Sequence, residues 1–309
     1  MIRRVFLILL SLFLLAGCTK TAQPQEGVRF LDHTGTVVTA PRYPKKVALL
    51  TSSLADLWIT AGGKVDITVG QSVERGFAEP TAILVDSGAG KTVSLELLLA
   101  QKPDLVLYAS DLSEQRSCGK LLMDAGIPAA GFSVESFGDY LAVLKICTDI
   151  LGTPERYETY GIEKKQQIDA MITDVQGQKA PPSILFVRAG SSAKVTKAKT
   201  AENHFVCAML KELDTYNIAE KAPILLDGLS TEEILLSDPD HIFFTTMGEE
   251  TAAQSYIQSL LSDPVWKTMT AVKEGNVCML PKELFQYKPN ARWPEAYAYL
   301  IEILYGEDL

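Results

Sequence analysis

One stretch of this sequence occurs twice. Residues 94–110 are SLELLLAQKPDLVLYAS and residues 230–246 are STEEILLSDPDHIFFTT, so the second copy starts 136 residues after the first. In both, Ser-x-Glu precedes Leu or Ile, and Pro-Asp follows the Glu by seven residues, just before an apolar run. This pattern favours a serine-capped helix followed by a buried strand. A helix joined to a strand through Pro-Asp is a common connection, but the matching Ser, Glu and aromatic positions favour equivalent units in two similar lobes.

The rest of the chain alternates short apolar runs with amphipathic segments, after a predicted hairpin at 28–40 with its turn at His33-Thr34-Gly35. Apolar runs at 45–50, 65–70, 103–110, 127–134, 183–190, 239–246 and 275–281 predict strands, and the segments between them predict helices. Such alternation indicates parallel α/β sheets. The charged segment after Pro154 has apolar residues at helical spacing and predicts one long helix. We therefore expect two parallel-sheet α/β lobes at 28–152 and 181–309, joined by an interlobe helix at 153–180, with a ligand cleft between the lobes.

The first residues are typical of export. A basic MIRR precedes the apolar run 5–15, which is too short to span a bilayer comfortably, and LAGC follows at 15–18. This segment resembles a bacterial lipoprotein signal, which would end at residue 18, with Cys18 as the lipidation site and 19–27 as a polar tether. The resemblance implies a lipid-anchored protein on the outer face of the cytoplasmic membrane. An ordinary cleaved signal or a buried N-terminal helix is the alternative.

Composition and motifs exclude several classes. The net charge is −9, so composition gives no support for a nucleic-acid partner. No nucleophile elbow, Walker loop, HExxH or kinase motif occurs, and we expect no enzyme activity. The remaining cysteines lack CxxC spacing, and their apolar settings favour buried free thiols, although export permits disulfides and the sequence leaves their state open; they are Cys118, Cys147, Cys207 and Cys278.

Several motifs in order resemble one family. PKKVALL, SLELLLAQKPDLVL, AGIP, EILLSDPDHIFFT, DPVWKTMTAVKEGNVCML and PNARWPEA together resemble the substrate-binding lipoproteins of ABC importers in the ferric-siderophore, haem and cobalamin class. The resemblance implies a monomer without an intrinsic cofactor, an interlobe helix that limits hinge motion, and a permease dimer with ATPase subunits as partner. It also implies that Glu96 and Glu232 dock on the permease, one per lobe. The alternative role for both is to complement a helix N-terminus.

Ligands of parallel α/β lobes meet the loops at the carboxyl ends of strands. This rule selects residues 51–53, 71–75, 108–112, 188–199, 245–249 and 285–293. Cations in the second-lobe loops predict a positive cleft wall for an anionic ligand; they are Arg188, Lys194, Lys197, Lys199, Lys288 and Arg292. We favour Arg188 and Lys288 as contacts, expect the three lysines at 194–199 to be solvated, and note that Arg292 also suits the closing helix. The other predicted contacts are Ser52, Ser53, Trp58, Tyr108, Phe285 and Tyr287, with Trp293 a further aromatic candidate.

Only three histidines occur, at 33, 204 and 241. A site for a bare zinc or manganese ion usually needs a cluster of histidines and carboxylates, which this composition does not favour. We therefore expect the ligand to be a metal complex, with a ferric siderophore favoured and haem or cobalamin as alternatives. Tyr287 and His204 are the candidates for direct contact with iron. His204 begins a predicted helix, so a capping or core role is its alternative; His241 lies in a strand and is expected to be structural.

Overall fold

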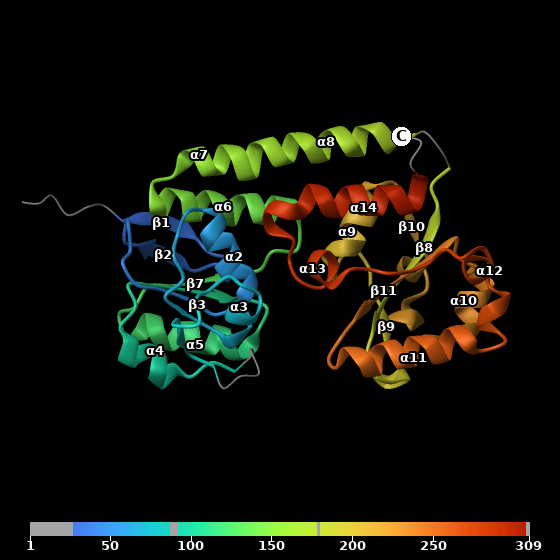
Figure 1. The fold of residues 1–309 in the computed structure, drawn as a ribbon, viewed down its shortest axis with the longest axis horizontal. Coiled ribbons are helices and arrows are strands. Elements are labelled where there is room, and N and C mark those ends of the chain that lie inside the picture. The colour runs from blue at the N-terminus through green and yellow to red at the C-terminus, as the bar shows by residue number, and fades with distance from the viewer. Residues whose placement is uncertain (1–26, 87–91, 178–179, 307–309) are drawn as a thin grey trace, which may run out of the picture.

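The structure is a computed structural model that describes residues 27–86, 92–177 and 180–306; the proposed signal and Cys18 lie outside these ranges. Figure 1 shows two lobes side by side, with a long helical segment running across both. Each lobe is built on a mainly parallel sheet with helices around it. The predicted fold class, two α/β lobes, is confirmed. Within the described residues, no helix is both long enough and apolar enough to cross a membrane.

The N-terminal lobe starts with an antiparallel hairpin of β1 (Val28–Leu31) and β2 (Val37–Ala40). Its parallel sheet has the order β5-β4-β3-β6-β7. The strands are β3 (Val47–Leu49), β4 (Ile67–Thr68), β5 (Ile83–Leu84), β6 (Leu105–Ala109) and β7 (Ala129–Phe132). The helices are α2 (Ser52–Thr60), α3 (Gly70–Glu74), α4 (Leu95–Gln101), α5 (Ser113–Asp124) and α6 (Phe137–Leu151).

The C-terminal lobe has the parallel order β10-β8-β11-β12, with β9 antiparallel to β8. Its strands are β8 (Ser183–Ala189), β9 (Lys197–Ala198), β10 (Tyr216–Asn217), β11 (His241–Thr246) and β12 (Val277–Met279). Its α-helices are α9 (Phe205–Glu212), α10 (Thr231–Ser237), α11 (Glu250–Ser262), α12 (Thr270–Glu274), α13 (Lys282–Phe285) and α14 (Trp293–Tyr305). Short 3₁₀ turns are η3 (Ala193–Val195), η4 (Ile218–Glu220), η5 (Pro223–Leu226), η6 (Trp266–Thr268) and η7 (Asn290–Arg292).

The lobes are linked by consecutive helical segments inside the predicted range 153–180: α7 (Pro154–Tyr157), the π-helical turn η2 (Glu158–Ile162) and α8 (Glu163–Val175). The π turn departs from the single regular helix that the sequence predicts. There the Tyr140 hydroxyl of α6 donates to the Tyr160 carbonyl at 2.9 Å, which gives one backbone group of the widened turn a partner outside the helix. Gly161 faces Leu141 of α6, where an added Cβ would lie 3.1 Å from the leucine side chain.

The repeated stretch forms equivalent units. β6 lies between β3 and β7, and β11 lies between β8 and β12, so the two copies have the same place in their sheets. Ser94 caps α4 and Ser230 caps α10, each accepting a backbone N–H three residues on at 3.3 Å. Both helices end on a left-handed residue, Lys102 or Asp238.

The repeated Pro-Asp also has one structural role in both lobes. The Asp104 carboxylate accepts the N–H groups of Lys45 and Lys46, just before β3, at 2.8 and 2.9 Å. The Asp240 carboxylate accepts the N–H of Ser183, the first residue of β8, at 2.7 Å. In each lobe the aspartate therefore ties the beginning of its own strand to the neighbouring strand.

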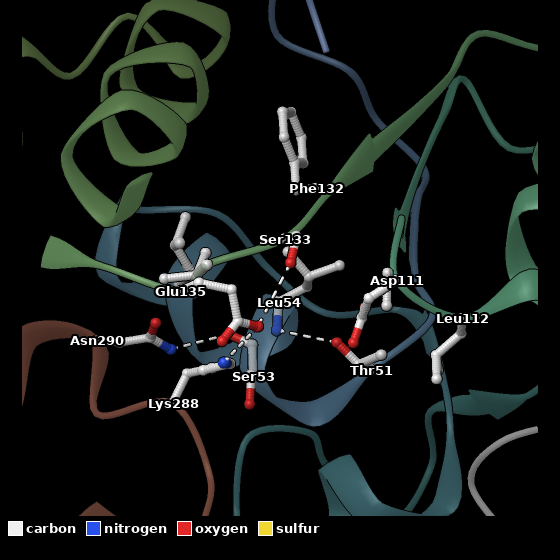
Figure 2. A pocket seen from close by; sticks show the side chains of 13 residues that line it. Thr51, Ser53, Leu54, Asp111, Leu112, Phe132, Ser133, Glu135, Lys288 and Asn290 are labelled. Atoms are coloured by element: carbon white, nitrogen blue, oxygen red, sulfur yellow. Dashed lines mark hydrogen bonds and ion pairs between the residues drawn. The ribbon is translucent and has the colours of Figure 1, made fainter. Parts of the chain in front are cut away.

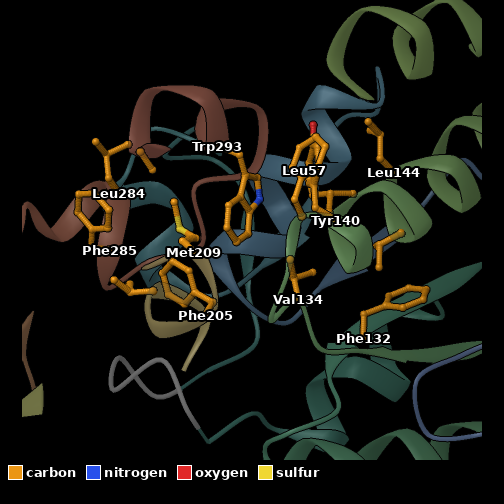
Figure 3. Packing of buried hydrophobic residues seen from close by; sticks show 14 of the residues in the cluster. Leu57, Phe132, Val134, Tyr140, Leu144, Phe205, Met209, Leu284, Phe285 and Trp293 are labelled. Atoms are coloured by element: carbon orange, nitrogen blue, oxygen red, sulfur yellow. The ribbon is translucent and has the colours of Figure 1, made fainter. Parts of the chain in front are cut away.

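One hydrophobic cluster extends through both lobes and the linking helices (Figure 3). Trp293, at the start of α14, is fully buried between Phe137 of α6 and Phe205 of α9, with ring centroids 6.1 and 5.6 Å away. Burial of large aromatic surface contributes several kcal/mol per side chain to stability. The lobes therefore share a core at this junction, which resists independent motion.

Candidate functional site

A cleft between the lobes is the candidate site. Two adjoining pockets, of about 170 and 240 Å³, share the lining residues Asp111, Glu135 and Lys288. Lys288 comes from the C-terminal lobe and the two acids from the N-terminal lobe. Together the pockets are large enough for a small molecule, whose sites are usually on the order of 300–1,000 Å³.

The first pocket is mostly apolar and is lined mainly by the N-terminal lobe (Figure 2). Thr51 caps α2 by accepting the Leu54 N–H at 3.3 Å. This cap aims the first turn of α2 at the cleft, so that Ser53 and Leu54 line it. Its remaining lining residues are Leu57, Ala109, Asp111, Leu112, Phe132, Ser133, Val134, Glu135, Lys288 and Asn290.

The second pocket is polar and belongs mainly to the C-terminal lobe. Arg188 near the end of β8 pairs in register with Thr245 of β11, and both line the pocket. Burial lowers the pKa of the Arg188 guanidinium, because charge is costly where water is excluded. The Thr245 hydroxyl is buried and has no hydrogen-bond partner among the described residues. A buried hydroxyl without a partner beside a desolvated cation is suited to an oxygen-rich anion.

His204 lines the same pocket as a neutral helix cap. Its Nδ1 accepts the Val206 N–H at 3.3 Å, and its ring lies 4.6 Å from the Phe186 ring and 5.2 Å from that of Phe205. Burial, together with the nearby charges of Lys288, Arg188 and Lys199, lowers its pKa to about 3. Because Nδ1 accepts, the proton of the neutral ring is at Nε2. In this tautomer no ring lone pair is free for iron, which argues against the predicted direct coordination.

Polar side chains of the C-terminal lobe contact the N-terminal lobe at three places among the described residues. Lys288 pairs with Glu135 at 2.8 Å, between the two pockets (Figure 2). Arg75 pairs with Glu283 at 3.3 Å. Asn290 donates to both the Ser53 carbonyl and the Asp56 carboxylate at 2.8 Å. These contacts hold the cleft walls together, and a ligand anion at Lys288 would compete with Glu135.

Asp56 is part of this junction and is largely buried. Burial raises the pKa of its carboxyl, while the hydrogen bond from Asn290 and the charges of Arg75 and Arg292 oppose the rise. A buried carboxylate beside an amide donor is a structural feature of the junction, since it does not line either pocket.

The structure brings some of the predicted contacts into the cleft: Ser53, Arg188, Lys288 and His204. The predicted ligand contacts Trp58, Tyr108 and Phe285 lie outside both pockets. Trp58 and Phe285 are 1% and 0% exposed, and Tyr108 is 5% exposed with its ring against Gly119 and Gly131. All three side chains fill the lobes because they point into the sheet–helix layers.

Three further predicted contacts lie outside both pockets. Ser52 is buried and its hydroxyl is bound to Gln71 and Arg75. Tyr287 stacks on the Arg75 guanidinium, 3.8 Å from the ring centroid, at the other interlobe contact. Arg292 is half exposed and pairs with Glu295 at 2.7 Å in the first turn of α14, the alternative that the sequence left open. Tyr287, the predicted iron contact, therefore lines neither pocket.

Sequence reasoning missed the loop after β7, where Ser133, Val134 and Glu135 line the cleft, and also Asn203 and Phe205 at the start of α9. The strand at 127–134 was predicted, so the rule of strand carboxyl ends applied to it would have found this loop. No group of three or more His, Cys, Asp or Glu in the described ranges is placed to hold a metal ion. The cysteines of these ranges are free, with Cys118, Cys147 and Cys207 buried and Cys278 partly buried.

Two α/β lobes, a helical link and a cleft between them form the architecture of the molecule. A sequence profile for the family described as Periplasmic binding protein matches residues 47–284. The chain therefore belongs to the periplasmic binding protein family, whose members bind ligands for transport, and membership implies an extracytoplasmic location. A search of curated protein sequences finds no match.

Solved structures show the same fold at low identity. A periplasmic binding protein of Veillonella parvula is 16% identical with a TM-score of 0.71, covering 92% of this chain and 93% of its own. SirA of Staphylococcus aureus, in complex with staphyloferrin B, is 17% identical with a TM-score of 0.69 and coverage of 90% and 98%. The haem-binding protein RhuT of Roseiflexus sp. RS-1 is 18% identical with a TM-score of 0.68 and coverage of 86% and 98%.

Proposed function

We propose that this protein captures an anionic iron complex, a ferric siderophore, in the interlobe cleft and delivers it to an ABC permease. The observation that carries the proposal is the polar pocket: Arg188 and Lys288 supply charge, and the Thr245 hydroxyl is buried without a partner. Asp111 and Glu135, the acids in the cleft, come from the N-terminal lobe, whereas Arg188 and Lys288 come from the C-terminal lobe. The iron belongs to the ligand, and the protein needs no intrinsic cofactor. Siderophore-bound SirA, which has the same fold, supports this ligand class.

Haem is the second candidate, because the pocket of the N-terminal lobe is apolar. Leu54, Leu57 and Phe132 would cover a flat hydrophobic edge while Arg188 and Lys288 bind carboxylates. Cobalamin is the third candidate, but it is bulky and nearly neutral and would make less use of the cations.

The test is a binding panel with the chain that begins after Cys18. Catecholate and hydroxamate ferric siderophores, haem and cobalamin are titrated while tryptophan fluorescence and absorption spectra are recorded. We expect saturable binding of one ferric siderophore that weakens in Arg188→Gln but not in Lys194→Gln, a loop cation outside the pockets. A shifted Soret band would assign haem, and binding of cobalamin alone would refute the iron proposal.

The permease contact is proposed on Glu96 and Glu232. Both are exposed at equivalent positions in the first turns of α4 and α10, one in each lobe. A permease dimer with approximate two-fold symmetry would pair each with a cation. The double change Glu96→Gln and Glu232→Gln is expected to reduce uptake of the bound complex by cells, while the purified variant keeps its affinity for the ligand.

Lipid anchoring at Cys18 is proposed from the sequence alone. Cells expressing the full chain should incorporate labelled palmitate into the protein, and Cys18→Ala should abolish the label and release the protein from membranes. Incorporation of labelled palmitate into the Cys18→Ala variant would refute acylation at this residue.

A further inference from the structure

The two copies of the repeated stretch match on their exposed faces as well as in their caps. On α4, Glu96 and Leu99 are three residues apart, and on α10 Glu232 and Leu235 have the same spacing. Residues three apart on a helix lie on one side of it. The two leucines are almost equally exposed, at 38% and 39%. Each lobe therefore presents an acid and an apolar side chain together.

The fold explains the other positions that the two copies share, but not the exposed glutamates and leucines. The serines cap the helices, the aspartates tie adjacent strands, and Leu98 and Ile234 are fully buried. Glu96 and Glu232 lie in the first turns of α4 and α10. Their side chains make no hydrogen bond or ion pair within the described residues. A single exposed leucine is ordinary on a protein surface. Its recurrence beside an unpaired acid on an equivalent helix points to a partner that is itself repeated.

The two faces differ in their other apolar side chains. Leu236 follows Leu235 on α10 and is 80% exposed, whereas Ala100 has the matching place on α4. Leu236 lies four residues after Glu232 and so extends the same face. Leu97, 45% exposed and three residues before Ala100 on α4, has Glu233 as its counterpart on α10, so α4 carries two partly exposed leucines and α10 one partly and one largely exposed leucine. Figure 1 shows α4 and α10 in different lobes, each toward the side away from the interlobe junction.

We propose that Leu99, Leu235 and Leu236 are apolar contacts for the permease and that α10 binds it more strongly than α4. The inference rests on the importer role proposed above and names the partner chemistry: two related sites, each with a cation beside an apolar depression. The acids steer and orient the complex, while the leucines supply the area removed from water. The greater exposure of Leu236 makes the two halves unequal and favours one orientation on a symmetric dimer.

The test is site-specific photocrosslinking of the full chain in its host cells. A benzophenone amino acid replaces Leu99, Leu236 or, as control, Ile224, which is 59% exposed in the same lobe as α10 but lies on η5. Adducts are identified by mass spectrometry. We expect adducts with the membrane-spanning subunit of an ABC importer from positions 99 and 236 and not from 224. Permease adducts from 224 at equal yield, or none from 99 and 236, would overturn the proposal.

Uptake measurements provide the second readout. Loss of a leucine from a buried contact weakens association about tenfold, so Leu236→Ser should lower uptake at limiting protein while Ile224→Ser does not. Ala100→Leu should strengthen docking. If Leu236→Ser and Ala100→Leu change nothing while the double glutamate variant fails to dock, the leucine inference is wrong and the importer role remains. If no variant changes uptake and no importer subunit is crosslinked, both are wrong.

Discussion

The neutral state of His204 leads to a specific prediction for stability against pH. Burial lowers its pKa to about 3 from the ordinary 6.5. Between these values the unfolded chain binds a proton that the folded chain does not, so stability falls as pH drops below 6.5. At pH 5, about 1.5 units below the ordinary pKa, the free energy of unfolding is lower by about 2 kcal/mol, at about 1.4 kcal/mol per unit. Protonation would also break the cap to Val206.

The assay is urea unfolding at pH 7.5 and pH 5, followed by the fluorescence of the buried Trp58, Trp266 and Trp293. The variant His204→Asn keeps a side chain that caps helices well and removes the titration. Contributions from His241 and from carboxylates are common to both proteins and cancel in the comparison. We expect the wild type to lose about 2 kcal/mol more than His204→Asn between the two pH values. A difference below about 0.5 kcal/mol would refute the neutral, buried state of this ring.

Three further predictions follow from single side chains. Raising salt from 50 to 500 mM should weaken binding of an anionic ferric chelate more in wild type than in Arg188→Gln, measured by fluorescence titration, because that variant lacks one of the screened charges. Phe285→Ala should cost about 3–5 kcal/mol in denaturant unfolding, since the ring is fully buried; a loss under 1 kcal/mol would contradict the core assignment. Lys102→Gly should raise stability by about 0.5–1 kcal/mol at its left-handed position, whereas Asp238→Gly should not, because the Asp238 carboxylate accepts the Thr270 N–H and hydroxyl at 2.8 and 2.7 Å.

The lining of the cleft shows where reasoning from sequence stops. The carboxyl ends of strands lead to several loops that line the cleft, because strand direction follows from chain order in a parallel sheet. Within those loops, Ser52 and Ser53 are adjacent, yet only Ser53 lines the cleft while Ser52 is buried against Gln71 and Arg75. Which neighbour faces the cleft depends on the first turn of α2, and this is set by the cap at Thr51.

Aromatic residues were the least predictable part of the site. Trp58, Tyr108 and Phe285 have the composition of a stacking surface, but each is buried in its lobe. An aromatic ring stabilises a core and a binding wall by the same removal of apolar area from water, so residue type does not separate the two roles. Only the packing around each ring decides between them.

The sequence by itself determined the two-lobe α/β organisation, because strand and helix periodicities are local and the repeated stretch specifies the same caps, strand ties and buried positions in both lobes. It also showed that the two lobes carry an acid at the same position of the repeated stretch, Glu96 in one and Glu232 in the other. The tertiary structure alone decided how the cleft is lined, since Lys288 meets Glu135 and Asn290 meets Asp56 across lobes far apart in sequence. Such contacts depend on how the shared core places one lobe against the other. Local sequence patterns do not predict this placement.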